Sequence, residues 1–127
     1  MRWCFDNAVH PYADAILARL AAGEDAVVPI LWFYEVGNGL LMAYRRKRIA
    51  LDQIGAFLTR LKALPIDAAQ QAPAEILQLP VLAHSRGLTN YDAAYLALAN
   101  RFNLPLATTD SGLRKAATLA GVGILTV

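Results

Sequence analysis

Three carboxylates in this chain, Glu35, Asp92 and Asp110, lie within apolar stretches of sequence. Acidic side chains are rarely buried without a partner, because an isolated buried charge is strongly unfavourable. Acids held close together also repel one another, and a shared divalent cation removes that penalty. An all-oxygen ligand set suits Mg²⁺ or Mn²⁺, whereas zinc prefers nitrogen and sulfur. The sequence therefore predicts a metal site built from these three acids.

Each of these acids also has a structural interpretation. Asp110 is an ideal N-cap for the helix that follows it, but it also comes after a strand, where open α/β sheets bind ligands. Asp92 is the fourth residue of Thr89-Asn-Tyr-Asp, which matches a capping box. Glu35 has no basic residue three or four positions away, and Asn38 is one turn later on the same helix face. Glu35 is therefore the acid for which a structural explanation is weakest.

Strand-like and helix-like segments alternate along the chain, which predicts an α/β domain with a mainly parallel sheet. Helices are predicted at residues 11–22, 31–48, 51–64, 73–86, 91–102 and 111–120, and strands at 25–29, 65–68, 104–108 and 123–127. The helix over 31–48 is apolar almost all round, so we expect it to be buried on most sides. Gly37 and Gly39 within it should permit close packing or a kink, and Pro80 should kink or split the helix over 73–86.

Composition and length narrow the class of protein. A chain of 127 residues is predicted to form a single domain over residues 1–127. At 57% hydrophobic and 17% charged residues it is unusually apolar, which indicates either a surface that a partner covers or a fully buried parallel sheet. No apolar run reaches the length that a membrane-spanning helix needs. The lone Cys4 excludes an internal disulfide and favours a reducing compartment, so we expect a cytoplasmic protein.

Positive charge is concentrated in one run, Arg45-Arg-Lys-Arg48, although the net charge is only +2. Such a run is most often a solvated helix end, which the helix dipole favours there. Contact with the phosphates of a nucleic acid is the other interpretation. Charge alone leaves both interpretations open.

Three segments occur together in an order and spacing typical of one known family. They are Trp32-Phe-Tyr-Glu35-Val-Gly-Asn38, Leu88-Thr89-Asn-Tyr-Asp92-Ala-Ala-Tyr and Leu104-Pro-Leu-Ala-Thr-Thr-Asp110. Together they resemble the PIN domain, and most closely the toxin subunits of VapBC toxin–antitoxin pairs. The resemblance implies a three-layer PIN-like fold, in which a mainly parallel sheet is flanked by helices.

The same resemblance implies an activity, partners and a site. The activity is that of an endoribonuclease that cleaves RNA phosphodiester bonds with Mg²⁺ or Mn²⁺ and a metal-activated water molecule. The partners are an RNA substrate, a cognate antitoxin protein and a second copy of the chain in a homodimer, with no membrane. The implied catalytic and metal-binding residues are Glu35, Asp92 and Asp110, with Asn38, Thr89 and Thr109 as supporting polar groups.

The start of the chain departs from the family pattern. Family members open with an apolar strand that is central in the sheet and ends in an Asp, followed by Ser or Asn. Here residues 1–7 are predicted to end the first helix, so the strand and the fourth acid are expected to be missing. Asp6 is the one residue that could substitute for that acid, but it is assigned to a loop. Either the natural protein starts earlier, or the chain is a truncated relative. The neighbouring strands would then pair directly or exchange between protomers, because unpaired strand edges are not tolerated.

Three functions are compatible with these observations. The first is a metal-dependent ribonuclease, the toxin of a toxin–antitoxin pair. The alternative is a catalytically silent PIN-like module that acts through self-association or antitoxin binding, which a missing acid would favour. A phosphatase-like α/β hydrolase is the third, although the sequence offers no candidate nucleophilic acid at a strand end near the N-terminus.

Overall fold

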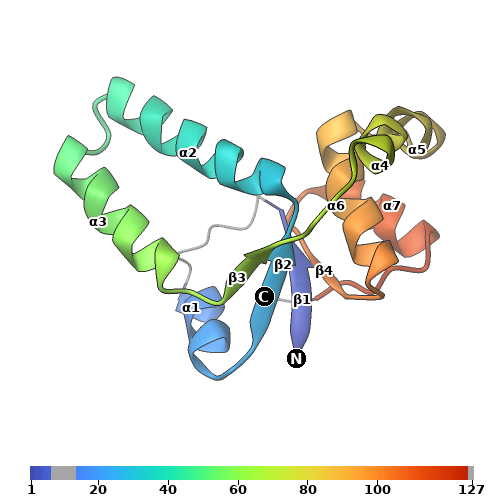
Figure 1. Cartoon of the computed structure of the whole chain (residues 1–127), viewed down its shortest axis with the longest axis horizontal. Helices are drawn as coiled ribbons and strands as arrows, with labels where there is room; N and C mark the ends of the chain where they lie inside the picture. The colour runs from blue at the N-terminus through green and yellow to red at the C-terminus, as the bar shows by residue number, and fades with distance from the viewer. Residues whose placement is uncertain (7–13, 126–127) are drawn as a thin grey trace.

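A computed structural model describes residues 1–6 and 14–125, and at its centre is a parallel sheet of four short strands (Figure 1). The strands lie in the order β3-β2-β1-β4, and every neighbouring pair is parallel. Their bounds are Arg2–Phe5 (β1), Asp25–Val28 (β2), Ile66–Ala68 (β3) and Leu106–Ala107 (β4). An isolated parallel bridge between Leu106 and Ile124 continues the pairing beyond β4. The predicted α/β fold with a mainly parallel sheet is confirmed.

The first strand, which the sequence was expected to lack, is present in the middle of the sheet. In β1, Cys4 pairs with Val27 on one side and with Leu106 on the other. The predicted absence of this strand is therefore wrong, and neither direct pairing of its neighbours nor strand exchange is needed. The prediction failed because a short apolar run fits a buried strand and a buried helix equally well, so periodicity cannot separate them. Cys4 is fully buried, as expected for a central parallel strand covered on both faces.

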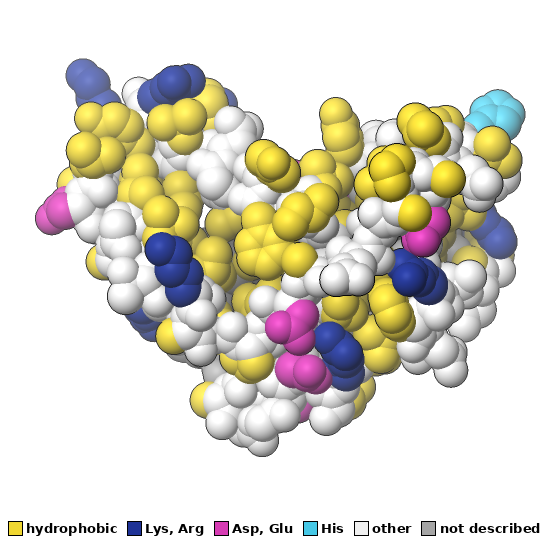
Figure 2. All heavy atoms as spheres, viewed as in Figure 1, with side chains coloured by type: hydrophobic (Ala, Val, Ile, Leu, Met, Phe, Trp, Pro, Cys, Tyr) yellow, Lys and Arg dark blue, Asp and Glu magenta, His cyan; other side chains and the backbone are white. Residues whose placement is uncertain are grey.

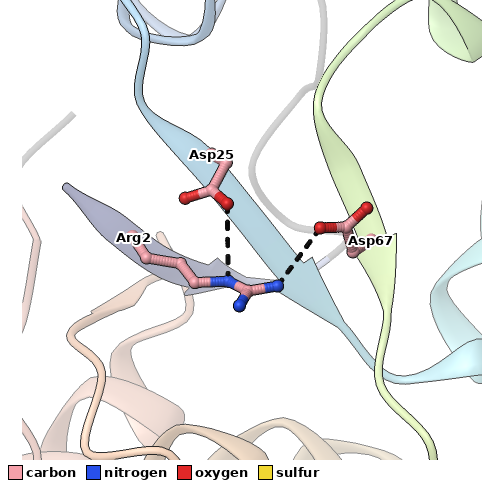
Figure 3. Close-up of polar contacts among 3 residues, drawn as sticks. All are labelled: Arg2, Asp25 and Asp67. Carbon is pink, nitrogen blue, oxygen red and sulfur yellow. Dashed lines mark hydrogen bonds and ion pairs between the residues drawn. The ribbon is translucent and has the colours of Figure 1, made fainter.

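An arginine on β1 links three strands near the edge of the sheet where β1 and β2 begin. Arg2 Nε lies 3.6 Å from Asp25 Oδ2 on β2, and Arg2 Nη2 lies 3.2 Å from Asp67 Oδ2 on β3 (Figure 3). All three side chains are exposed to a large extent, and ion pairs of this kind contribute about 0–1 kcal/mol. These two acids are therefore paired with a cation and are not needed for a metal site.

Seven helices accompany the sheet within the described residues. Their bounds are Asp14–Ala21 (α1), Ile30–Arg45 (α2), Leu51–Lys62 (α3), Pro73–Leu77 (α4), Leu79–Arg86 (α5), Asn90–Arg101 (α6) and Ser111–Leu119 (α7). In Figure 1, α4 to α7 lie on one side of the sheet, whereas α2 and α3 form a two-helix hairpin that projects from the other side. The predicted helix over 73–86 is split at Gln78, and Pro80 lies in the first turn of α5, where proline is tolerated. None of the described helices is long and apolar enough to cross a membrane.

Among the described helices, α6 has the most residues in the buried core. Six residues of α6 are buried, and the core also includes side chains from α1, α2, α7 and the strands. The largest fully buried side chains include Trp32, Tyr95, Ile16, Leu96, Leu98, Leu106 and Leu113. Asp92 is in the first turn of α6, so this core also fixes the backbone position of that acid.

The helix α2 is far more exposed than its apolar sequence predicts. Its only buried side chain is Trp32, and Tyr34 is 75% exposed. A Cβ added at Gly37 or Gly39 would meet none of the surrounding atoms within 4 Å. The expected burial on most sides and the expected close packing at the glycines are therefore wrong. They failed because α2 extends beyond the sheet, so only its first turns meet the core of the described chain.

Candidate active site and metal centre

Four acids follow a strand or begin a helix at the edge of the sheet where the strands end. Asp6 directly follows β1, Glu35 is in the second turn of α2 after β2, and Asp110 is the N-cap of α7 after β4. Asp92 is in the first turn of α6, and this helix runs back toward the start of β4, so its N-terminus is at the same edge. Open α/β sheets bind their ligands at this edge. The three acids predicted from the sequence are therefore gathered at one edge of the sheet, and Asp6 joins them.

Asp6 is the fourth acid, at the place where none was expected. Its side chain is 2% exposed, and Thr108 Oγ1 donates a hydrogen bond to Asp6 Oδ2 at 2.7 Å. The same hydroxyl accepts the N–H of Asp110 at 3.0 Å, so one buried threonine links the acids after β1 and β4. Asp6 lies outside regular secondary structure, directly after β1, as expected, but this position is at the strand-end edge beside Asp110, so an acid is present where the sequence was expected to lack one. The sequence did contain the signal, because Trp3-Cys-Phe is followed by Asp6 and Asn7, the order that the family pattern describes.

A buried tyrosine connects Glu35 to Asp6. Tyr95 on α6 is 1% exposed, and its hydroxyl donates a hydrogen bond to Glu35 Oε1. Burial is the main cause that raises the pKa of Tyr95 above its ordinary value of 10, and the nearby Glu35 and Asp6 raise it further. The phenol therefore stays protonated and acts on the acids as a hydrogen-bond donor. Neither Tyr95 nor Thr108 was predicted for the site, because the sequence of an apolar segment does not show whether a hydroxyl within it only packs or also binds a site residue.

The lone cysteine lies beside this site and is not a nucleophile. Burial, followed by the charge of Asp6, raises the pKa of the Cys4 thiol far above its ordinary value of 9.0. The thiol is therefore protonated at neutral pH, and the thiolate is the form that reacts. Cys4 serves as a small apolar side chain in the central strand.

Asp92 and Asp110 lie in the first turns of their helices and also experience each other's charge. Thr89 Oγ1 accepts the N–H of Asp92 at 3.1 Å, and Asp110 Oδ2 accepts the N–H of Leu113 at 2.8 Å. The helix-capping interpretation therefore holds for Thr89 and Asp110. Burial raises the pKa of Asp92 above its ordinary value of 3.8; the hydrogen bond with Thr89 opposes this, and the charge of Asp110 adds to it. Asp92 and Asp110 are thus close enough to repel each other when both are ionised.

Acids elsewhere in the fold are held in a different way. Glu24, Asp25, Asp67 and Glu75 each form an ion pair with an arginine. At the strand-end edge, by contrast, the donors described above are hydroxyl and backbone N–H groups. Such donors orient the carboxylates, and four carboxylates gathered at one edge of the sheet suit a cation.

The donor set fits a hydrated Mg²⁺ or Mn²⁺ ion. All four acids offer carboxylate oxygens, which these cations prefer. Within residues 1–6 and 14–125, no three His, Cys, Asp or Glu side chains are arranged to enclose a metal ion by themselves. A closed cage is not required, because Mg²⁺ keeps several water ligands and is usually bound through one or two carboxylates. Asn38 and Thr109 are exposed, and their supporting role stays a prediction.

The sequence profile of the PIN domain matches residues 4–119, from β1 to the end of α7. The chain belongs to the PIN-domain family. The crystal structure of PAE2754 from Pyrobaculum aerophilum is similar to this PIN domain with a TM-score of 0.75 and 24% sequence identity, over 91% of this chain and 84% of that chain. This similarity shows a shared fold. No curated protein sequence gives a significant match. PIN domains are generally nucleases that depend on divalent metal ions, which agrees with four acids at one edge.

A polar hollow of this PIN domain lies away from the acids. It has a volume of about 520 Å³ and is lined by Gln70, Gln71, Ala72, Glu75 and Arg101. Arg101 is the last residue of α6, nine residues after Asp92, which corresponds to roughly 14 Å along the helix. Its guanidinium donates hydrogen bonds to Gln70 O at 2.9 Å and to Glu75 Oε2 at 3.0 Å. The hollow is therefore a separate surface feature and not the acid site.

Asp92→Asn should raise the free energy of unfolding of the PIN domain at neutral pH when divalent ions are absent. Folding raises the pKa of this carboxyl above 3.8, so the folded state disfavours the ionised form. The wild type should therefore lose stability relative to the variant as the pH rises through that pKa, and the difference should vanish below the ordinary pKa. Urea denaturation in EDTA from about pH 3 to about pH 7 measures this difference.

A suitable control is Asp67→Asn, which removes an exposed acid that is paired with Arg2. That variant should show no gain in stability with rising pH, because it loses a favourable partner and not a repulsive one. A stability difference between wild type and Asp92→Asn that does not change with pH would contradict the expectation.

Proposed function

We propose that this PIN domain is an endoribonuclease that depends on Mg²⁺ or Mn²⁺ and is the toxin of a VapBC-type toxin–antitoxin pair. The observation that supports this most is the buried Asp6, which Thr108 holds beside the backbone of Asp110 at the strand-end edge. A buried acid close to other acids is costly unless a cation offsets its charge. A metal-dependent nuclease uses such a cation in its reaction, which accounts for an otherwise unfavourable arrangement.

The side chains of this chain have separate tasks in the proposed reaction. A bound Mg²⁺ or Mn²⁺ ion would neutralise charge on the phosphate and lower the pKa of the attacking water. Thr108 holds the carboxylate of Asp6 in one orientation, and Tyr95 does the same for Glu35. Groups that are already oriented need no reorganisation when charge develops during the reaction. The proposed carboxylate ligands come from the set Asp6, Glu35, Asp92 and Asp110, of which one or two would bind the ion directly and the others through its water molecules.

Cleavage of single-stranded RNA by the purified chain should require a divalent ion. We expect products with Mn²⁺ or Mg²⁺, none in EDTA, and recovery when excess Mn²⁺ is restored. Asp110→Asn should lower the rate by about 100-fold or more, because one ligand loses its charge. The fold should be retained, because asparagine is an equally good N-cap for α7. Gel analysis of labelled RNA measures the rate, and calorimetric titration with Mn²⁺ measures metal binding.

Asp67→Asn is the matched control for this experiment, because it also removes one aspartate charge but from an exposed side chain paired with Arg2. It should keep both cleavage and metal binding. Cleavage that persists in EDTA, or equal Mn²⁺ affinity of the wild type and Asp110→Asn, would count against the proposal.

A catalytically silent binding module is the second candidate, because α2 leaves apolar side chains uncovered. Ile30 is 52% exposed and Tyr34 is 75% exposed, and exposed apolar surface is typical of protein interfaces. An antitoxin or a second copy of the chain would cover this face in either case. The acid whose expected absence favoured a silent module is present, so we place this function second. It would replace the first if the chain binds Mn²⁺ and leaves a panel of RNAs intact.

A further inference from the structure

The hairpin of α2 and α3, residues 30–62, holds most of the unbalanced positive charge of this PIN domain. We call it the basic arm. It carries six of the twelve Lys and Arg residues and only two of the ten Asp and Glu residues. The rest of the chain therefore has more acids than cations. Figure 2 shows Lys and Arg side chains at the far end of the arm, and Figure 1 shows that this end lies away from the sheet.

Four consecutive cations form the tip of the basic arm. Arg45, Arg46, Lys47 and Arg48 are all exposed, and none of them forms an ion pair within the part of the chain that the structure describes. The helix dipole accounts for Arg45 in the last turn of α2. It does not account for Lys47 and Arg48, which lie beyond the helix end. The solvated helix end is therefore an incomplete explanation of this run.

The backbone conformation of Lys47 favours a functional role for the positive charge at the tip. Lys47 has φ of 60°, in the left-handed region that glycine adopts most readily. A glycine would make this turn with less strain, yet a lysine is present and keeps the run of cations unbroken. A strained residue of this kind is a reason to look for a function at the tip.

The tip is connected to the acid site by one face of α2. Glu35, Asn38, Met42 and Arg46 follow one another at spacings of three or four residues, so their side chains share a helix face. The ten residue-to-residue steps from Glu35 to Arg45 span about 15 Å, the length of roughly four stacked nucleotides. A single strand whose scissile phosphate lies at the acids would thus reach the tip within a few nucleotides.

We propose that the tip of the basic arm binds the phosphate backbone of the single-stranded RNA substrate, a few nucleotides from the bond that is cut. This inference rests on the proposed function for the identity of the ligand. The arm also offers exposed aromatic rings, with Tyr34 75% and Tyr44 41% exposed, on which unpaired bases can stack. A run of cations that directly follows an exposed aromatic ring, on a helix that also carries an acid of the proposed nuclease site, favours RNA over an acidic protein surface.

Direct binding of RNA tests this proposal without depending on cleavage. The probe is a fluorescein-labelled single-stranded RNA of about 12 nucleotides, longer than the roughly four that span the arm, in EDTA so that it stays intact. The arm variant combines Arg46→Gln, Lys47→Gly and Arg48→Gln. We expect it to bind about 10- to 100-fold more weakly at low salt, because three phosphate contacts are lost. Fluorescence anisotropy from about 50 to about 200 mM salt should show the slope of log affinity against log salt shallower by about 2.

The matched control removes the same number of positive charges, three, from arginines outside the basic arm. It combines Arg2→Gln, Arg19→Gln and Arg101→Gln, three arginines that already pair with Asp25, Asp67, Glu24 and Glu75. The control should change the salt slope far less than the arm variant does, because its arginines have acidic partners within the fold. Thermal unfolding of both variants checks that each is folded.

Two results would overturn the inference. Equal weakening of the arm variant and the control would mean that only the total charge matters. Unchanged RNA binding of the arm variant would also overturn it, and a simultaneous loss of self-association in sedimentation would assign the tip to a protein contact. A wild type that binds RNA through the tip but cuts no RNA would instead count against the proposed nuclease function and leave the binding result standing.

Discussion

Asp6→Asn is expected to reduce RNA cleavage by roughly 100-fold or more while the PIN domain stays folded. Asp6 is 2% exposed, so the substitution removes a charge from inside the proposed metal site and not from its margin. The amide oxygen of asparagine can still accept the 2.7 Å hydrogen bond from Thr108 Oγ1, which is why the local structure should survive. A gel assay with Mn²⁺ measures the rate, and urea denaturation measures the free energy of unfolding.

Asp25→Asn is the matched control for this result. Asp25 begins the neighbouring strand β2, pairs with Arg2 and lies at the opposite end of the sheet from the site acids. It should keep nearly full activity. A folded Asp6→Asn protein that cleaves RNA at the wild-type rate would exclude Asp6 from the site and leave only the three acids predicted from the sequence.

Trp32→Ala is expected to lower the free energy of unfolding by about 3–5 kcal/mol. Trp32 is fully buried, it is the only buried side chain of α2, and its ring makes an edge-to-face contact with Phe33 at 5.1 Å between centroids. Its removal leaves a cavity that the surrounding residues fill only in part. Because Glu35 is on the same helix three residues later, the loss should also loosen the position of this acid. Urea denaturation monitored by circular dichroism measures the first effect.

Tyr34→Ala provides the comparison on the same helix. Tyr34 is 75% exposed, so its truncation should change the free energy of unfolding by only about 0.5 kcal/mol or less. If Trp32→Ala is no more destabilising than Tyr34→Ala, the first turns of α2 are not anchored in the core as the structure describes. Under conditions where Trp32→Ala is folded, we also expect it to cleave RNA more slowly than the wild type. That loss would reflect the displacement of Glu35.

The sequence was a good guide to the elements and to three of the four acids. Alternation of strand-like and helix-like segments predicted the parallel α/β fold, and the observed bounds of most elements differ from the predicted ones by only a few residues. Glu35, Asp92 and Asp110 could be found because a charged residue in an apolar stretch is conspicuous, and because each follows or begins an element at the same edge of the sheet. Both signals are local in sequence.

The sequence was a poor guide wherever a residue depends on distant partners. The segment Arg2–Phe5 becomes a strand only because β2 and β4 are available on both sides, and four residues carry too little periodicity to show this. Thr108 and Tyr95 were missed for the same reason, because their hydrogen bonds span 102 and 60 positions in the chain. The exposure of α2 was missed because hydrophobicity predicts that a face will be covered, but not whether the covering surface belongs to the same chain.

The sequence alone determined the class of fold and the acidic character of the proposed site. Hydrophobic periodicity and charged residues within apolar stretches are properties of short segments, so they can be found without the tertiary structure. Only the tertiary structure decided that Asp6 lies at the same edge as the three predicted acids, and that Thr108 and Tyr95 donate hydrogen bonds to Asp6 and Glu35. The physical reason is that parallel strands place the ends of segments far apart in the chain at one edge of the sheet. A carboxylate such as Asp6 acquires its neighbours, and with them its proposed role, only when that edge is assembled.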